Sequence, residues 1–150
     1  MSVATRTLID TNILVYRYDR RFPDKQRIAT EVLRDGIASG SARIAHQSIV
    51  EFVAATSRGG KEHRLLDTAA ARREAEEFMV QFPILYPDTS VLRMALRGTA
   101  AYGLSWFDAH LWACAEVHGV AELLSEDFQH GRMYGTVLVR NPFLSVSPAT

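Results

Sequence analysis

Short apolar runs alternate with longer amphipathic segments along the whole chain. The apolar runs predict strands at residues 7–10, 42–45, 84–86, 122–124 and 136–140. Between them, apolar residues recur at helical spacing and predict helices at residues 25–38, 48–57, 68–82, 88–102 and 107–118. Strands that alternate with helices are typical of an α/β fold with a largely parallel sheet.

The size and charge of the chain narrow this picture. It has 150 residues, of which 47% are hydrophobic, and we expect a single domain over residues 1–150. Its 17 basic and 17 acidic residues cancel, so no global positive field indicates a nucleic-acid partner. A polyanion would have to be held by local arginines or by a metal ion.

The sequence also predicts the compartment. Cys114 is the only cysteine, which rules out an intrachain disulfide and gives no sign of an oxidising environment. Residues 1–7 contain no apolar signal core, and no uninterrupted apolar stretch reaches membrane-spanning length. We therefore expect a cytoplasmic protein with no membrane partner.

Four acids stand in unusually apolar surroundings. Asp10 ends the first predicted strand, Glu51 and Asp108 lie within apolar helical segments, and Asp127 follows the strand at 122–124. Ligand chemistry in open α/β sheets collects at the carboxyl ends of strands. If these carboxylates converge there, a hard divalent cation is the simplest way to keep them charged.

Three of these acids also have ordinary structural interpretations. Asp10 is a suitable cap for a helix that starts near Thr11, and Ser48 with Glu51 fits a capping box. Asp127 is suited to capping the turn at Phe128, and its neighbour Glu126 competes with it as a metal ligand. Local sequence leaves both interpretations open at each position.

Of the four acids, Asp108 is the one for which the sequence most clearly favours a functional role. Ser105 three residues before it also fits a capping box. However, the helix at 107–118 is apolar almost all round, and Leu111 and Trp112 share a face with Asp108. An unpaired carboxylate in such a helix is costly, so a functional role is favoured.

Other catalytic chemistries lack their motifs. The five histidines form no spaced zinc pair, and the sequence contains neither a nucleophile elbow nor a glycine-rich phosphate loop. The chemistry that the sequence favours is therefore oxygen ligands around a hard metal ion.

In their order along the chain these acids resemble the motifs of PIN domains, in particular VapC-type toxin ribonucleases of type II toxin–antitoxin systems. The resemblance covers nearly the whole chain. The motifs that carry it are Ile9-Asp10-Thr11-Asn12, Ser48-Ile49-Val50-Glu51-Phe52, Ser105-Trp106-Phe107-Asp108-Ala109 and Leu124-Ser125-Glu126-Asp127-Phe128.

The resemblance implies a three-layer α/β/α sandwich and hydrolysis of RNA phosphodiesters by a metal-activated water, with Mg²⁺ or Mn²⁺ as cofactor. It implies catalytic roles for Asp10, Glu51, Asp108 and Asp127, with the three aspartates as metal ligands. Thr11, Asn12 and Ser125 are implied as lesser neighbours that contact the substrate. One and two metal ions both fit four acids.

The resemblance also implies two protein partners, which are a small cognate antitoxin and a second copy of the chain. Trp112 and Phe143 are candidate aromatic contacts for such partners, although both are also suited to the core.

RNA must also be gripped, and two groups of cationic residues are candidates. Arg17, Arg20 and Arg21 follow the first motif, with Lys25 and Arg27 close behind, and we expect the three arginines to contact RNA. The second group surrounds two glycines after the Glu51 helix and comprises Arg58, Lys61, His63 and Arg64. Solvated surface loops account equally well for any single member.

Three alternatives stay open at this point. A receiver domain has a similar acidic pocket, but it resembles chains with a lysine after a late strand, and the two lysines here, Lys25 and Lys61, are early. A PIN-like fold kept only for binding is the second. A structure-specific DNA nuclease is the third, and no additional arch or clamp is apparent for it.

Overall fold

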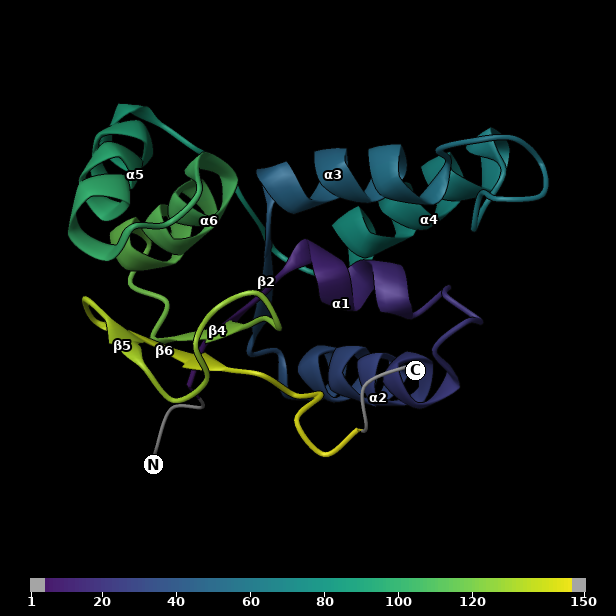
Figure 1. Cartoon of the computed structure of the whole chain (residues 1–150), viewed down its shortest axis with the longest axis horizontal. Coiled ribbons are helices and arrows are strands. Elements are labelled where there is room, and N and C mark those ends of the chain that lie inside the picture. The colour runs from purple at the N-terminus through teal and green to yellow at the C-terminus, as the bar shows by residue number, and fades with distance from the viewer. Residues whose placement is uncertain (1–4, 147–150) are drawn as a thin grey trace.

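The computed structural model describes residues 5–146 and places a six-stranded sheet between two layers of helices (Figure 1). The strand order is β3-β2-β1-β4-β6-β5, and all neighbours run parallel except β5 and β6. The strands are β1 (Thr7–Ile9), β2 (Ala42–Ala45), β3 (Ile84–Leu85), β4 (Glu122–Leu124), β5 (Met133–Tyr134) and β6 (Val137–Arg140). The predicted fold class is confirmed.

The helices divide between the two faces of the sheet. They are α1 (Thr11–Tyr16), α2 (Pro23–Ser39), α3 (His46–Thr56), α4 (Thr68–Gln81), α5 (Thr89–Tyr102) and α6 (Trp106–Val117). Helices α1 to α4 cover one face and α5 and α6 the other (Figure 1). Successive strand residues serve opposite layers, because Leu8 packs with the α5–α6 core and Ile9 with the α1–α4 core.

Local sequence explains several helix ends. Asp67, Asp88 and Ser105 each accept a hydrogen bond from a backbone N–H in the first turn of the helix that follows. Gly40 and Gly103 close α2 and α5 at φ of 68° and 64°, which is the left-handed conformation that glycine adopts without strain.

Helix α3 begins two residues before its predicted start, and this changes the interpretation of Glu51. Strand β2 leads directly into α3, with Ala45 at the N-cap and no side-chain cap. Ser48 is therefore inside the helix, where its hydroxyl is buried and makes no hydrogen bond. The proposed capping box of Ser48 and Glu51 is wrong, because such a box requires the serine at the N-cap.

Two short elements are not among the strands and helices that the hydrophobic pattern predicted. Strand β5 is only two residues long, and no periodicity is detectable over that length. Helix α1 has six residues and follows Asp10, which caps it as the structural alternative predicted. The other boundaries agree with the predicted ones to within two residues.

The placement of α6 depends on a close approach to α5. A Cβ atom at Gly98 would lie 2.7 Å from the ring of Trp112, so only glycine allows this packing. Trp112 is 3% exposed and its indole N–H donates to the Tyr134 carbonyl, and Phe143 is also buried. Both aromatic residues belong to the core and are not contacts for a partner.

The strand order excludes the receiver alternative. In receiver-type sheets β1 lies between β2 and β3, whereas here it lies between β2 and β4. Within the described part of the chain, no helix has the length and apolar character needed to cross a membrane. Residues 1–4 of the N-terminal segment that lacks a signal core lie outside the described residues.

Candidate active site

Asp10, the first of the four acids, lies at the end of β1, where the order of the strands in the sheet reverses. Strands β2 and β3 extend to one side of β1, and β4 and β6 extend to the other. The register pairs Ile9 with Leu124, and the backbone N–H of Asp10 donates to the Leu124 carbonyl over 3.0 Å. Asp10 and the loop after β4 therefore meet at a topological switch point, which is the place where open α/β sheets bind ligands.

Asp10 is buried and held by hydrogen bonds. Its Oδ1 accepts from the Thr11 N–H at 2.6 Å, and its Oδ2 accepts from the Ser125 hydroxyl at 2.5 Å. Burial raises the pKa of Asp10 to about 7, assisted by the charges of Asp127 and Asp108 and opposed by these hydrogen bonds. Asp10 thus caps α1 and belongs to the acid cluster at the same time.

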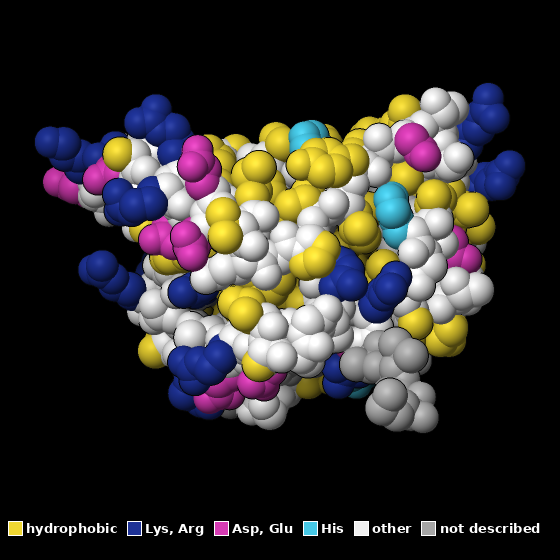
Figure 2. Space-filling view, turned by 180° about the vertical axis from the view of Figure 1, so that it is seen from behind, with side chains coloured by type: hydrophobic (Ala, Val, Ile, Leu, Met, Phe, Trp, Pro, Cys, Tyr) yellow, Lys and Arg dark blue, Asp and Glu magenta, His cyan; other side chains and the backbone are white. Residues whose placement is uncertain are grey.

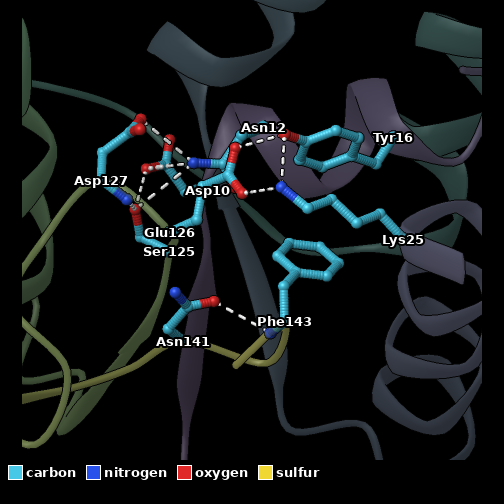
Figure 3. Close-up of polar contacts among 9 residues, drawn as sticks. All are labelled: Asp10, Asn12, Tyr16, Lys25, Ser125, Glu126, Asp127, Asn141 and Phe143. Carbon is cyan, nitrogen blue, oxygen red and sulfur yellow. Dashed lines mark hydrogen bonds and ion pairs between the residues drawn. The ribbon is translucent and has the colours of Figure 1, made fainter. Parts of the chain in front are cut away.

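Asn12 links three of the polar groups. Its amide nitrogen Nδ2 lies 3.4 Å from Asp10 Oδ2, 3.4 Å from Ser125 Oγ and 3.1 Å from Asp127 Oδ2 (Figure 3). Its amide oxygen and the hydroxyl of Thr11 are buried without a hydrogen-bond partner. Unpartnered oxygens beside a carboxylate leave acceptors available for a cation or a water.

Glu51 is positioned by a residue that the sequence analysis missed. Gln47, one turn earlier on α3, donates from Nε2 to Glu51 Oε1 at 2.6 Å and to the Phe107 carbonyl at 3.0 Å. Its Oε1 lies 3.0 Å from Nδ1 of His110. The four-residue spacing of Gln47 and Glu51 on a helix is the signal that would have identified this pair.

Asp108 stands in the first turn of α6 and is half-buried. Its backbone N–H donates to Ser105 Oγ over 3.2 Å, so the Ser105 half of the predicted capping box is present. Burial raises the pKa of Asp108, with a smaller contribution from the charge of Asp127 and opposition from Ser105. A cap and a destabilised carboxylate therefore coexist at this helix start.

The two adjacent acids after β4 have different neighbours. Asp127 is exposed, accepts from Asn12, and raises the pKa of both Asp10 and Asp108. Glu126 instead pairs with Tyr16 and Lys25. Of the two candidates for the fourth acid, Asp127 is the one that faces the others.

All four predicted acids line one cavity of about 370 Å³. Asp10 comes from the end of β1, Glu51 from α3, Asp108 from α6 and Asp127 from the loop after β4. Gln47, Phe107 and Glu126 also line the cavity. Four acids that lie far apart in the sequence therefore line the same cavity.

The donor chemistry of this cavity fits a hard divalent cation, because the acids and the unpartnered oxygens of Thr11 and Asn12 are all oxygen ligands. As the side chains stand, no three His, Cys, Asp or Glu residues within 5–146 are close enough to share one ion. Binding would therefore draw in the less buried carboxylates of Asp108 and Asp127.

Of the three predicted RNA-binding arginines, Arg21 alone lines the cavity. Arg21 lines the cavity and forms a two-point ion pair with Asp19, at 2.9 and 2.8 Å. Arg17 instead lies over the rings of Tyr18 and Phe78, 5.6 and 5.9 Å from their centroids. Arg20 is exposed and outside the cavity lining.

Of the remaining candidates, Thr11 and Asn12 line the cavity and Ser125 does not. Ser125 is fully buried and Thr11 is 8% exposed. The second basic group, which comprises Arg58, Lys61, His63 and Arg64, lies in the loop between α3 and α4 and does not line the cavity.

An acidic cavity at the switch point of a mostly parallel sheet defines a class of α/β proteins with oxygen-ligand sites. Within that class, a family model described as PIN domain matches residues 7–135. The chain belongs to the PIN domain family.

Solved structures share the same fold. A toxin–antitoxin complex from Klebsiella pneumoniae is 18% identical, with a TM-score of 0.65 over 91% of this chain and 97% of that chain. VapBC from Salmonella typhimurium bound to DNA is 12% identical, with a TM-score of 0.67 over 92% and 98%. FitAcB from Neisseria gonorrhoeae is 15% identical, with a TM-score of 0.61 over 92% and 99%. No curated protein matches the sequence.

Proposed function

We propose that this chain is a cytoplasmic endoribonuclease that depends on Mg²⁺ or Mn²⁺ and acts as the toxin of a toxin–antitoxin pair. The observation that carries the proposal is the convergence of Asp10, Glu51, Asp108 and Asp127 on one cavity. The family match and the fold shared with proteins named as toxin–antitoxin complexes support it.

The residues divide into two roles. Asp10, Asp108 and Asp127 would hold the cation, and Asn12 and Ser125 fix the carboxylate of Asp10 for that purpose. When bound, a divalent ion lowers the pKa of a water and stabilises charge on a phosphate oxygen. Glu51 keeps Oε2 free to accept a proton from the attacking water, because Gln47 is bonded to Oε1.

The test is cleavage of single-stranded RNA with Mg²⁺, with Mn²⁺ and with excess chelator. Asp10→Asn and Asp108→Asn should each lower the metal-dependent rate by roughly a hundredfold or more, because each removes a charge from the reacting centre. Asp35→Asn is the matched control, since Asp35 is exposed on α2 and outside the acidic cavity. Full cleavage in chelator would contradict the proposal.

The same assay distinguishes the proposed ribonuclease from the two alternatives, a PIN-like fold that only binds and a DNA nuclease. A PIN-like fold kept only for binding would retain RNA on a filter or gel without cutting it in either metal. Cleavage of DNA in preference to RNA would favour the DNA nuclease alternative instead.

An exposed apolar patch supports the expected second copy. Val50, Leu92 and Phe107 are 57%, 45% and 67% exposed, and with Trp106 and Pro87 they line a hollow of about 360 Å³ beside the acidic cavity. Figure 2 shows hydrophobic side chains gathered beside exposed histidines on the face seen from behind. Contiguous apolar surface of this kind marks a protein interface, and we assign it to a homodimer.

The antitoxin partner rests on the shared fold. The similar solved structures include complexes named toxin–antitoxin, VapBC and FitAB, and this chain covers nearly their whole length. We accordingly propose a small antitoxin protein as the cellular partner of this chain.

A further inference from the structure

Glu126 and Asp127 follow strand β4 as neighbours, yet their side chains are held by different groups. Both line the acidic cavity. Asp127 Oδ2 accepts from Asn12 at 3.1 Å and its backbone N–H donates to Ser125 Oγ at 3.0 Å. Glu126 Oε1 accepts from the Tyr16 hydroxyl at 2.5 Å, and Oε2 pairs with Lys25 Nζ at 2.9 Å (Figure 3).

Lys25 is itself fixed in place. Its ammonium donates to the Tyr16 hydroxyl at 3.2 Å and lies 4.8 Å from the centroid of that ring. The rings of Phe22 and Phe143 are each 5.7 Å from the same nitrogen. Three aromatic rings lie around the ammonium of a Lys25 side chain that is only 20% exposed, and they hold the cation by electrostatic attraction and limit its access to other anions.

The segment after β6 supplies one of the three aromatic rings around Lys25, that of Phe143. Asn141 Oδ1 accepts from the Phe143 N–H at 2.9 Å, which fixes the turn (Figure 3). Phe143 then packs edge-on against Tyr16, with ring centroids 5.0 Å apart. Phe143 lies beyond residues 7–135, so this support is outside the part of the chain that the family model matches.

The contacts of Glu126 with Lys25 and Tyr16 decide how many carboxylates are available to a cation. Lys25 neutralises Glu126 beside a cavity that the four predicted acids also line, and the two hydrogen bonds aim the Glu126 carboxylate at α1 and α2. Without Lys25, Glu126 would be a partly buried charge with only the neutral Tyr16 hydroxyl as its partner, and a cation in the cavity would be the remaining group able to neutralise it.

We propose that Lys25 is a positioning residue that holds Glu126 out of the metal site and thereby makes Asp127 the fourth acid. This inference rests on the proposed metal-dependent function, but its test measures metal binding and not RNA cleavage.

The experiment is a double-mutant cycle read by calorimetric titration of Mn²⁺ into the whole protein. Asp127→Asn should weaken Mn²⁺ binding by at least the roughly 10- to 100-fold that loss of an outer-sphere partner causes. Lys25→Met with Asp127→Asn should bind roughly tenfold more tightly than Asp127→Asn alone, because the released Glu126 replaces the lost carboxylate. Adding Glu126→Gln to that pair should abolish the recovery.

Three controls fix the interpretation. Lys25→Arg retains the charge and should give no recovery with Asp127→Asn. Glu126→Gln alone should leave Mn²⁺ binding little changed, and it needs no change at Lys25 if Lys25→Met fails to fold. Thermal melts report folding of every variant.

The outcomes separate this inference from the proposed function. If the parent binds no Mn²⁺, both are overturned. If the parent binds Mn²⁺ but Lys25→Met gives no recovery, or Glu126→Gln weakens binding as much as Asp127→Asn, only the positioning role is overturned.

Discussion

The hydroxyl of Ser125 donates a 2.5 Å hydrogen bond to Oδ2 of Asp10, although the two residues are 115 positions apart in the sequence. The contact exists because β1 and β4 are neighbours in the sheet. Ser125 also accepts from the Asp127 N–H, so one buried hydroxyl connects two of the four acids. Because it is fully buried, Ser125 orients Asp10 and has no surface with which to contact a substrate.

Removing this hydroxyl should destabilise the protein in a pH-dependent way. Ser125 lowers the pKa of Asp10, which burial raises to about 7, so Ser125→Ala should raise that pKa further. In the variant, Asp10 of the folded protein would then stay protonated over a wider pH range than Asp10 of the unfolded chain. The free energy of unfolding falls as pH rises through that range. The loss should be about 1–3 kcal/mol at pH 8.5, where the parent carboxylate is charged, and smaller at pH 5.

Urea unfolding at the two pH values measures this difference. Ser90→Ala is the matched control, because Ser90 is exposed on α5. If Ser125→Ala loses the same free energy of unfolding at both pH values, the stabilisation by Ser125 does not depend on the charge of Asp10.

Neutralising Asp108 should stabilise the metal-free protein. Burial raises the pKa of this carboxyl, so the folded parent loses stability as pH rises from the unfolded pKa through the folded one. Asp108→Asn lacks that loss and keeps the cap, because the bond to Ser105 comes from the backbone N–H. The variant should melt a few degrees higher than the parent at pH 8 and nearly equally at pH 4.

Magnesium supplies the complementary measurement. Added Mg²⁺ should raise the melting temperature of the parent through binding to the native state, and that of the variant much less. A variant that melts lower in chelator and responds to Mg²⁺ as the parent does would make Asp108 a structural residue only.

Among the three arginines, Arg21 should contribute most to RNA binding. It lines the cavity and is oriented by the buried carboxylate of Asp19, whereas Arg20 is exposed outside it. Arg21→Ala should reduce the slope of log affinity against log salt by about 0.7, the value for one phosphate contact to a single strand. Fluorescence anisotropy with a catalytically inactive background checks this, and Arg20→Ala serves as the control. An unchanged slope for Arg21→Ala would make it a surface residue.

Breaking the apolar patch should separate the proposed dimer. Leu92→Glu places a charge in the hollow that Val50 and Phe107 also line, where pairing would have to bury it. Light scattering at tens of micromolar should report a monomer, and Leu144→Glu should stay dimeric because Leu144 is exposed outside this hollow. A monomeric parent would contradict the assignment.

Local pattern was sufficient for most of the fold. The strands at 42–45 and 122–124 have the predicted bounds, and the helix caps at Asp10 and Ser105 are where the residue types indicated. The prediction failed where tertiary structure overrode local preference. Ser48 looks like a cap, but β2 enters α3 without a turn, which places this serine inside the helix.

The sequence by itself identified Asp10, Glu51 and Asp108 as candidate site residues, because a carboxylate in an apolar segment is costly wherever that segment packs, and it left the choice between Glu126 and Asp127 open. Only the tertiary structure decided how they are used. The order of β1 and β4 brings Ser125 to Asp10, and the approach of α2 and the segment after β6 brings Lys25 and Phe143 to Glu126. These contacts join residues far apart in the chain, and no local preference specifies a partner at that distance.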